Sequence, residues 1–180
     1  RGINSFTTLQ PILMSILISI SFSIIIISPI STVAIGLAIG LNGMSSAAAG
    51  MGVASAAALL VWATLKVNKP GVPTAIALGG MKMMMPNFLT NPIMALPVAL
   101  TAAISSLSVP ILGMVGTPGS AGFGFVGLVS PLAALNAGSV GVIGMVIAWI
   151  AVPFAVGYVV DKVLGDVLHL YKKEIFVFKG

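Results

Sequence analysis

Long apolar runs alternate along the chain with shorter apolar segments that glycine, proline and serine interrupt. The four long runs cover residues 8–28, 44–66, 91–112 and 138–160. Each is close to the roughly 20 apolar residues that a helix needs to span a bilayer. The pattern therefore predicts an all-α integral membrane protein with about four transmembrane helices.

The segments 29–43 and 113–136 are apolar but hold helix-breaking residues at short intervals. Pro29 and Gly43 bracket the first segment, and glycines such as Gly122 recur through the second. In hydrocarbon, broken backbone survives only where it is buried in protein or lines a wet cavity. We therefore expect each segment to form a broken re-entrant hairpin.

The remaining segments are more polar or too short to span. We predict a turn-rich loop at 67–73, a helix lying at the membrane interface at 74–86, and a tail at 161–180 that begins with a short amphipathic helix and ends extended. The whole chain, 1–180, is predicted to be a single membrane domain. In it, an interfacial linker at 67–88 separates two halves.

The two halves carry a repeated sequence. Residues 42–54 (NGMSSAAAGMGVA) match residues 136–148 (NAGSVGVIGMVIA), with Asn, Ser, Gly-Met and Ala at corresponding positions. We therefore place repeat one at about 8–66 and repeat two at about 89–160. Paired units with a broken hairpin are typical of transporters, in which the substrate path lies where the broken segments meet.

Composition agrees with a membrane location. Of the 180 residues, 58% are hydrophobic and only 6% are charged, whereas a soluble domain carries about a quarter charged residues. The chain has no cysteine, which excludes disulfides, thiolate metal sites and a phosphocysteine. The net charge is +5, but the cations lie at the ends of apolar runs and form no basic face with aromatic residues, so nucleic-acid binding is not expected.

The positions of the cations predict an orientation in the membrane. With four spans, Arg1, Lys66, Lys82 and the lysines of the tail fall on one face, while the loops 29–43 and 113–137 contain no Lys or Arg. The positive-inside rule then puts both termini in the cytoplasm. Each repeat would hold two spans, so both repeats should enter from the same side and be related by an axis along the membrane normal.

Polar residues gather in the broken segments and at the expected helix starts that follow them. Such patches are costly in lipid unless a hydrophilic ligand or water offsets the cost. The alternative is plain N-capping, because Asn is a good N-cap and a serine three residues later can join it. The predicted substrate-binding residues are Ser31, Thr32, Asn42, Ser45, Thr117, Ser120, Asn136 and Ser139.

The other reactive residues suit structural roles better. His169 lies in the tail without an acid–base partner, and the methionines from Met81 to Met85 face all sides of a helix, which favours burial over a copper site. The acidic residues, beginning with Asp161, all follow the last span, whereas proton relays and cation pumps need ionisable groups inside the membrane. We predict no metal, cofactor or catalytic residue, hence no enzyme, and a neutral polar substrate.

The segments 28–50, 85–97 and 115–132 resemble an EIIC-like family of bacterial phosphotransferase-system membrane proteins. The resemblance covers most of the chain and implies, because members of that family are longer, that the chain corresponds to a C-terminal half. It also implies a sugar permease of the bacterial cytoplasmic membrane. Separate cytoplasmic phosphocarrier proteins would supply the phosphoryl group.

The chain departs from better-known sugar permeases in one respect. Those usually place a Glu, and often a His, near the sugar to aid phosphoryl transfer, and the hairpins here have neither. Either these groups lie in a preceding half, or this branch moves or senses its solute without phosphorylating it.

Our first hypothesis is a carrier for a small polar, sugar-like solute. The alternatives are a non-transporting membrane sensor or regulator of the same fold, and a passive channel lined by the glycine-rich hairpins. We expect a homodimer, or association with a preceding N-terminal half. The reason is that four spans and two hairpins leave little protein to bury irregular backbone.

Overall fold

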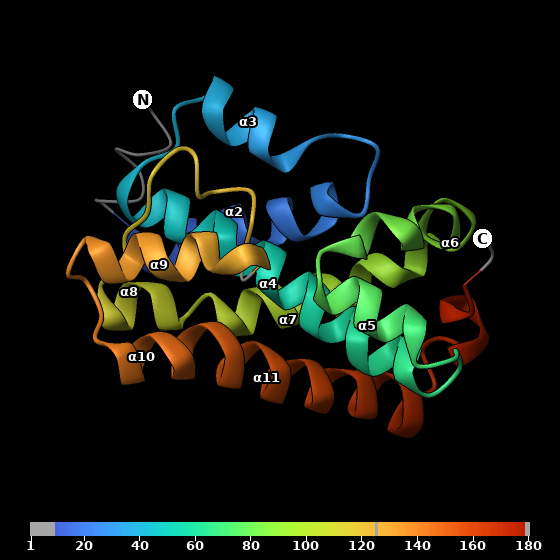
Figure 1. Ribbon diagram of the computed structural model, residues 1–180. Coiled ribbons are helices and arrows are strands. Elements are labelled where there is room, and N and C mark those ends of the chain that lie inside the picture. Colours follow the sequence, from blue (N-terminus) through green and yellow to red (C-terminus); the bar gives the residue numbers. More distant parts are fainter. Residues whose placement is uncertain (1–9, 125, 179–180) are drawn as a thin grey trace.

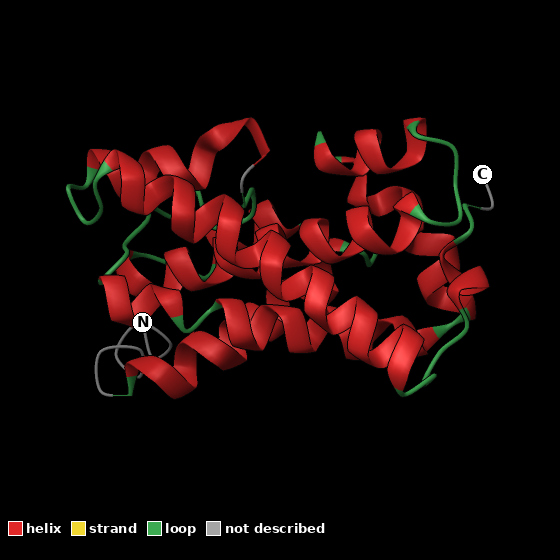
Figure 2. Ribbon diagram, turned by 90° about the horizontal axis from the view of Figure 1, so that it is seen from below, coloured by secondary structure: helices red, strands yellow, loops and turns green. Residues whose placement is uncertain are grey.

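Helices make up most of the structure, a computed structural model that describes residues 10–124 and 126–178 (Figure 1, Figure 2). Among these residues the only β-type pairing is an isolated antiparallel bridge between Gly43 and Gly116, so the predicted all-α class is confirmed. The helical segments are, in chain order, α2 (Pro11–Ile26), α3 (Thr32–Ala38), α4 (Gly43–Leu65), α5 (Gly71–Ala77), η1 (Gly80–Met84), α6 (Met85–Thr90), η2 (Pro92–Met94), α7 (Ala95–Ser105), α8 (Ser108–Leu112), η3 (Val126–Leu128), α9 (Val129–Asn136), α10 (Val142–Val146), η4 (Ile147–Ala151), α11 (Val152–Asp161), η5 (Lys162–Val167) and η6 (Lys173–Phe176).

Three helices of the described residues are long and apolar enough to cross a membrane: Gly43–Leu65, Pro92–Leu112 and Val142–Val167. They correspond to three of the four predicted spans. The helix of the remaining span, α2, has 16 residues, and at 1.5 Å per residue it is about 24 Å long, shorter than the roughly 30 Å of a bilayer core. Residues 8 and 9, where we expected that span to begin, lie outside the described residues.

α4 is the central helix and packs against α2, α7 and α11. Its alanines and glycines let the neighbouring backbones approach closely, as small residues do between membrane helices. A Cβ on Gly52 would collide with the carbonyl oxygen of Ser19 on α2. A Cβ on Gly50 would lie 2.8 Å from the Ser130 hydroxyl oxygen and 3.0 Å from the ring of Trp149.

α2 and α4 run in the same direction, and α3, which lies between them in the chain, runs back above them (Figure 1). At the end of α2, the carbonyl oxygen of Ser28 accepts a hydrogen bond of 2.6 Å from Lys82, which follows α4 in the chain. The segment 29–43 therefore returns along the molecule before α4 begins. An extended chain of this length reaches up to about 50 Å, enough to run back along a helix of about 24 Å.

The direction of the other helices differs from our expectation. α7 and α8 run opposite to α2, whereas the Val142–Val167 helix runs with α4 (Figure 1). The prediction that both repeats enter from the same side is therefore wrong for the described helices. Apolar length predicts that a helix forms, but the contacts of α4 decide which way each neighbour runs. Arg1, which that prediction also used, lies outside the described residues.

The region between α4 and the Pro92–Leu112 helix was predicted as a loop at 67–73 and one interfacial helix at 74–86. It forms three short helical segments instead, α5, η1 and α6, and none of them is long enough to cross a membrane. The left-handed backbone of Gly79, with φ of +119°, separates α5 from η1. The glycine pair at this position explains why one continuous helix does not form.

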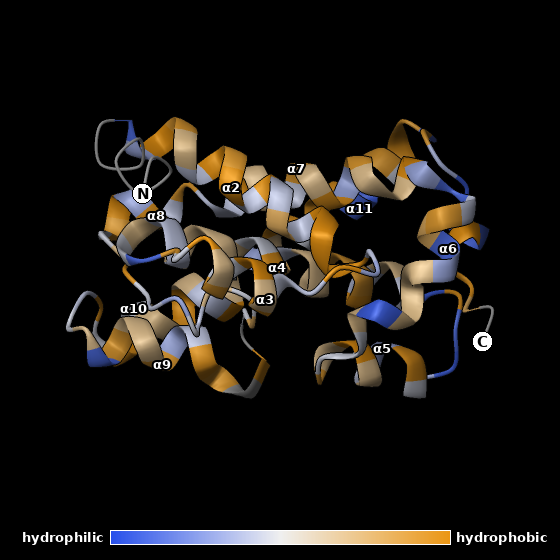
Figure 3. Cartoon of the chain, turned by 90° about the horizontal axis from the view of Figure 1, so that it is seen from above, coloured by the Kyte–Doolittle hydropathy of each residue, from blue (hydrophilic) through white to orange (hydrophobic). Residues whose placement is uncertain are grey.

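The tail also differs from the prediction, because the last helix continues to Val167 and includes the part expected as a separate amphipathic helix. The segment after it is docked on the linker. The buried amide of Asn87 donates hydrogen bonds of 2.6 Å to the carbonyl oxygens of Ile175 and Val177. Hydrophilic residues gather at this end of the molecule, beside α6 and the C-terminal segment (Figure 3).

Candidate functional site

Of the second predicted segment, 113–136, Val129–Asn136 forms α9, and we call the part before it, 113–128, the second broken segment. It lies against the first broken segment, 29–43. The backbone N–H of Gly43 donates to Gly116 at 3.0 Å, and the N–H of Gly116 donates back at 2.9 Å. Further along, the buried hydroxyl of Thr32 donates to the carbonyl oxygen of Gly122 at 2.9 Å. Hydrogen bonds at two places along the segments thus hold them side by side.

Glycine makes this approach possible. A Cβ on Gly122 would collide with the backbone nitrogen of Val33, and a Cβ on Gly36 would lie 2.9 Å from the Cβ of Ala121. Real Cβ atoms essentially never come this close. The glycines that predicted a broken hairpin therefore allow one broken segment to pack closely on the other.

A chain of hydroxyl groups fixes the second broken segment on α4. The buried hydroxyl of Ser46 donates to the carbonyl oxygen of Thr117 at 2.5 Å and lies 3.3 Å from the Ser120 hydroxyl oxygen. The Ser120 hydroxyl accepts from the N–H of Thr117 at 2.9 Å, and the Ser130 hydroxyl donates to the Ser120 carbonyl at 2.6 Å. Sequence reasoning missed Ser46 and Ser130, although Ser46 adjoins the predicted Ser45.

A cavity of about 580 Å³, which we call the Asn136 pocket, lies between the second broken segment and α9. It brings together three of the predicted residues, Thr117, Ser120 and Asn136, with apolar side chains such as Leu132. Asn136 is exposed, and its side chain makes no hydrogen bond to the residues that the structure describes. The volume lies within the range of about 300–1,000 Å³ that small-molecule sites occupy.

Asn136 and Ser139 do not begin a helix, so that prediction is wrong. Asn136 is the last residue of α9, and the next helix begins at Val142. Gly138 has a left-handed φ of +69°, and the N–H groups of Gly138 and Ser139 bond back to the carbonyls of Leu135 and Ala134. These are the two bonds of a Schellman motif, so the glycine ends one helix instead of following the start of another.

Asn42 and Ser45 lie at a helix start, as predicted. Asn42 is the N-cap of α4, and its side-chain oxygen accepts a hydrogen bond of 2.9 Å from the N–H of Gly43. Ser45 is buried in the first turn. The two copies of the repeat thus place their asparagines at opposite ends of helices, and only Asn136 lines the Asn136 pocket.

Ser31 and Thr32 lie in a second cavity, of about 220 Å³, which we call the Lys82 pocket. The Ser31 hydroxyl caps α3 by accepting from the N–H of Ala34 at 3.2 Å. Lys82 also lines this cavity; its side chain is exposed, and the partial burial of its amino group lowers its pKa. Sequence reasoning assigned Lys82 to the membrane interface. A lone cation within an apolar segment was the signal that could have identified it.

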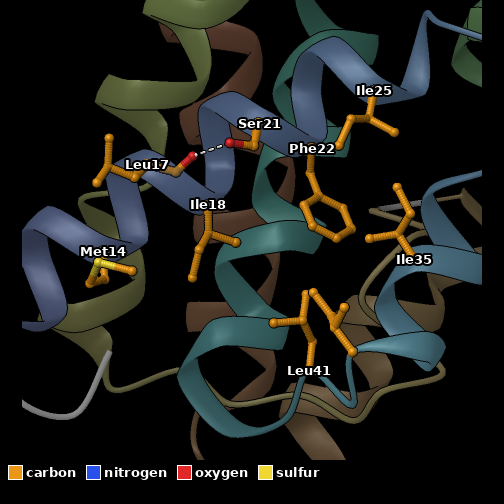
Figure 4. Close-up of a pocket in the computed structure, with 9 residues that line it drawn as sticks. Met14, Leu17, Ile18, Ser21, Phe22, Ile25, Ile35 and Leu41 are labelled. Carbon is orange, nitrogen blue, oxygen red and sulfur yellow. Dashed lines mark hydrogen bonds between the residues drawn. The ribbon is translucent and has the colours of Figure 1, made fainter. Parts of the chain in front are cut away.

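The apolar groove between α2 and α3 is a poor site for a polar solute. It has a volume of about 310 Å³ and is lined by side chains such as Phe22, Ile35 and Leu41 (Figure 4). The hydroxyl of Ser21, which also lines the groove, donates to the Leu17 carbonyl at 2.8 Å. The groove thus offers a polar ligand almost no hydrogen-bonding partner.

The methionines from Met81 to Met85 and His169 are not grouped as a metal site would require. Met81 and Met84 are buried in the hydrophobic core, although Met81 also borders the Lys82 pocket. His169 is exposed on the tail. Among the described residues, no group of three His, Asp or Glu side chains could hold a metal ion.

Comparison with known proteins places the chain in a family. The family model described as "Phosphotransferase system, EIIC" matches residues 1–178. No curated protein and no solved structure gives a match. Because the family match covers nearly all of the 180 residues, and the helices are apolar enough to cross a membrane, the chain belongs to the EIIC family, the membrane permease components of the phosphotransferase system.

Proposed function

We propose that the protein carries a small polar, sugar-like solute across the bacterial cytoplasmic membrane and binds it in the Asn136 pocket. The observation that carries this proposal is a cavity between the second broken segment and α9, in which the side chains of Thr117 and Asn136 are available to a ligand. Broken segments in permeases form the substrate site because their backbone must line a cavity or be buried.

The chemistry of the Asn136 pocket suits a sugar. The amide of Asn136 can donate to one sugar hydroxyl and accept from another, and the Thr117 hydroxyl can do the same. Leu132 and Val129 supply apolar surface for the C–H face of the ring. Ser46 and Ser120 act through Thr117, because their hydroxyl groups hold its backbone.

Alternating access then requires that the broken segments move with or against α4. The hydrogen bonds from Ser46 to Thr117 and between Gly43 and Gly116 tie the second broken segment to the start of α4. We propose that these elements move as one body relative to the peripheral helices. The contributions of Ser31, Asn42, Ser45 and Ser139 to solute binding stay predictions.

We further propose that the end bearing α6 and the tail faces the cytoplasm, with phosphocarrier proteins as its partners. Lys66, Lys82 and Lys173 lie on elements at this end, which the positive-inside rule assigns to the cytoplasm. A second copy, or a preceding half, would cover the exposed residues 29–31, 39–40 and 42. Broken helical segments survive in hydrocarbon only where protein buries them or a wet cavity adjoins them.

The first experiment is a thermal-stability screen of the purified protein against sugars and polyols. A solute at a hundred times its dissociation constant should add roughly 2.7 kcal/mol to the free energy of unfolding. We expect Asn136→Ala and Thr117→Val to lose this stabilisation. Thr74→Val, on exposed α5, should retain it. If both pocket variants keep the wild-type response, the proposed site is wrong.

Uptake measurements then separate a carrier from the two alternatives. We expect saturable uptake with counterflow in proteoliposomes for any solute that stabilises the protein. Binding without uptake would indicate a sensor, and uptake that does not saturate would indicate a channel. Either result would contradict the carrier function while leaving the solute site in place.

A further inference from the structure

The Lys82 pocket holds a positive charge that the protein does not neutralise. The amino group of Lys82 donates hydrogen bonds of 2.6 and 2.7 Å to the carbonyl oxygens of Ser28 and Ile30. Within the part of the chain that the structure describes, Lys82 has no carboxylate partner. The Lys82 side chain is exposed, so solvent and two carbonyl dipoles surround its charge, and no described carboxylate pairs with it.

The acidic residues are all committed elsewhere. The sequence has three Asp and Glu residues. Lys66 pairs with Asp161 at 3.1 Å and with Asp166 at 3.6 Å, and Lys173 also pairs with Asp166. Glu174 lies in η6 of the docked tail. None of these three side-chain carboxylates lines the Lys82 pocket.

A second donor faces the same cavity. The Ser31 hydroxyl accepts its hydrogen bond from Ala34, so its own proton remains available for another acceptor. The lowered pKa of Lys82 has burial as its cause. A negatively charged ligand next to the ammonium group would reverse that effect, because an opposite charge favours the charged form.

We propose that the Lys82 pocket binds an oxyanion group, a carboxylate or a phosphate, of the transported solute. This inference rests on the proposed permease function. It narrows the substrate class to sugar acids and sugar phosphates, in place of the neutral substrate that the sequence predicted. The two pockets border the same broken segment, because Ser120 lines the Asn136 pocket and Gly122 lines the Lys82 pocket. The neutral pocket recognises the hydroxyl groups and the cationic pocket the acid group.

The competing interpretation is that Lys82 only holds the carbonyls after α2 in place, as lysines do near helix ends. A structural lysine of this kind would not respond to anions. The two interpretations therefore differ in a measurable way, which is the accessibility of the Lys82 amino group when an acidic solute is present.

The test is lysine acetylation of the wild-type protein, read by mass spectrometry at constant ionic strength. The probes are gluconate, glucose 6-phosphate and glucose. An acidic probe at about ten times its dissociation constant should slow the labelling of Lys82 about tenfold, by mass action. Lys69, on the exposed loop before α5, should label at an unchanged rate and is the internal control. Equal labelling of Lys82 with and without both acidic probes would overturn the proposal.

Matched variants extend the test. We expect Lys82→Met to lose the thermal stabilisation by gluconate or glucose 6-phosphate, Lys82→Arg to keep most of it, and Lys69→Met to keep all of it. A wild-type response in Lys82→Met would contradict the proposal. If Lys82→Met does not fold, Lys82→Arg and the labelling data decide.

Two further outcomes separate this inference from others. If glucose stabilises the protein in a way that depends on Asn136 and neither acid has an effect, the permease proposal is supported. The proposal that the Lys82 pocket binds an oxyanion is then contradicted. In nanodiscs, protection of Lys82 by phosphatidylglycerol, but not by the acidic sugars, would assign the oxyanion to a lipid headgroup and overturn its assignment to the solute.

Discussion

The two helices that carry the repeated sequence have very different surroundings. In α4, 83% of its most apolar 18-residue stretch is buried, against 22% for the Val142–Val167 helix. Gly50 lies against Ser130 and Trp149, whereas a Cβ on the matching Gly144 would meet only the Val140 Cβ, at 3.8 Å. Small residues permit close packing, but a neighbour must be present to use it. The repeated small residues thus predict where another helix can pack closely, but not whether one does.

The glycine pair gives the largest expected effect. Gly50→Ala would push against Ser130 and Trp149, and overpacking of this kind costs about 1–3 kcal/mol. Gly144→Ala has room, and should be neutral or stabilise its helix by up to about 1 kcal/mol. Thermal unfolding in detergent measures both. Equal effects at the two positions would show that both helices are equally packed.

The asparagine pair comes next. Asn42→Ala removes the N-cap of α4 and should lower the free energy of unfolding by about 1 kcal/mol. Asn136→Ala removes no hydrogen bond to a described residue and should change stability by less than about 0.5 kcal/mol. Stabilisation by the solute should instead be reduced more by Asn136→Ala than by Asn42→Ala. A stability loss at Asn136 equal to that at Asn42 would contradict this division of roles.

The smallest effect concerns Ser46, whose counterpart in the second repeat is Val140. Ser46→Ala removes a donor to the Thr117 carbonyl, but the Ser120 hydroxyl still donates to that carbonyl at 3.0 Å. We expect a loss of about 0.5–1 kcal/mol, with weaker solute binding because the Thr117 backbone is less fixed. Val140→Ala is the matched control for the binding measurement. Unchanged solute affinity in Ser46→Ala would show that Thr117 does not need this support.

Much of the fold followed from apolar length and helix breakers. The spans at 44–66 and 91–112 agree with Gly43–Leu65 and Pro92–Leu112 within a few residues, because a long apolar run in lipid must satisfy its backbone as a helix. The family resemblance was also confirmed, since the EIIC family model matches residues 1–178. The site was predicted only in part, and Thr117, Ser120 and Asn136 are the residues that the structure brings into one pocket.

The sequence could not distinguish the two asparagines, because Asn one or two residues before a glycine suits both a helix start and a helix end. Gly43 has a left-handed φ of +58° at the start of α4, and Gly138 has one of +69° at the end of α9. The two glycines differ only in the residues to which their surrounding backbone is hydrogen-bonded. The bridge to Gly116 holds the first, and the bonds back to Leu135 and Ala134 hold the second helix end.

By itself, the sequence determined the class of the protein, its long helices and the two broken segments, because these depend on local hydrophobicity and on glycine and proline. The tertiary structure alone decided that α2 runs parallel to α4, that α4 is central, and that Lys82 borders a pocket beside Ser31. The physical reason is that helix direction and pocket composition arise from contacts between distant segments. Thr32 with Gly122 and Ser46 with Thr117 are such contacts, and no local pattern encodes them.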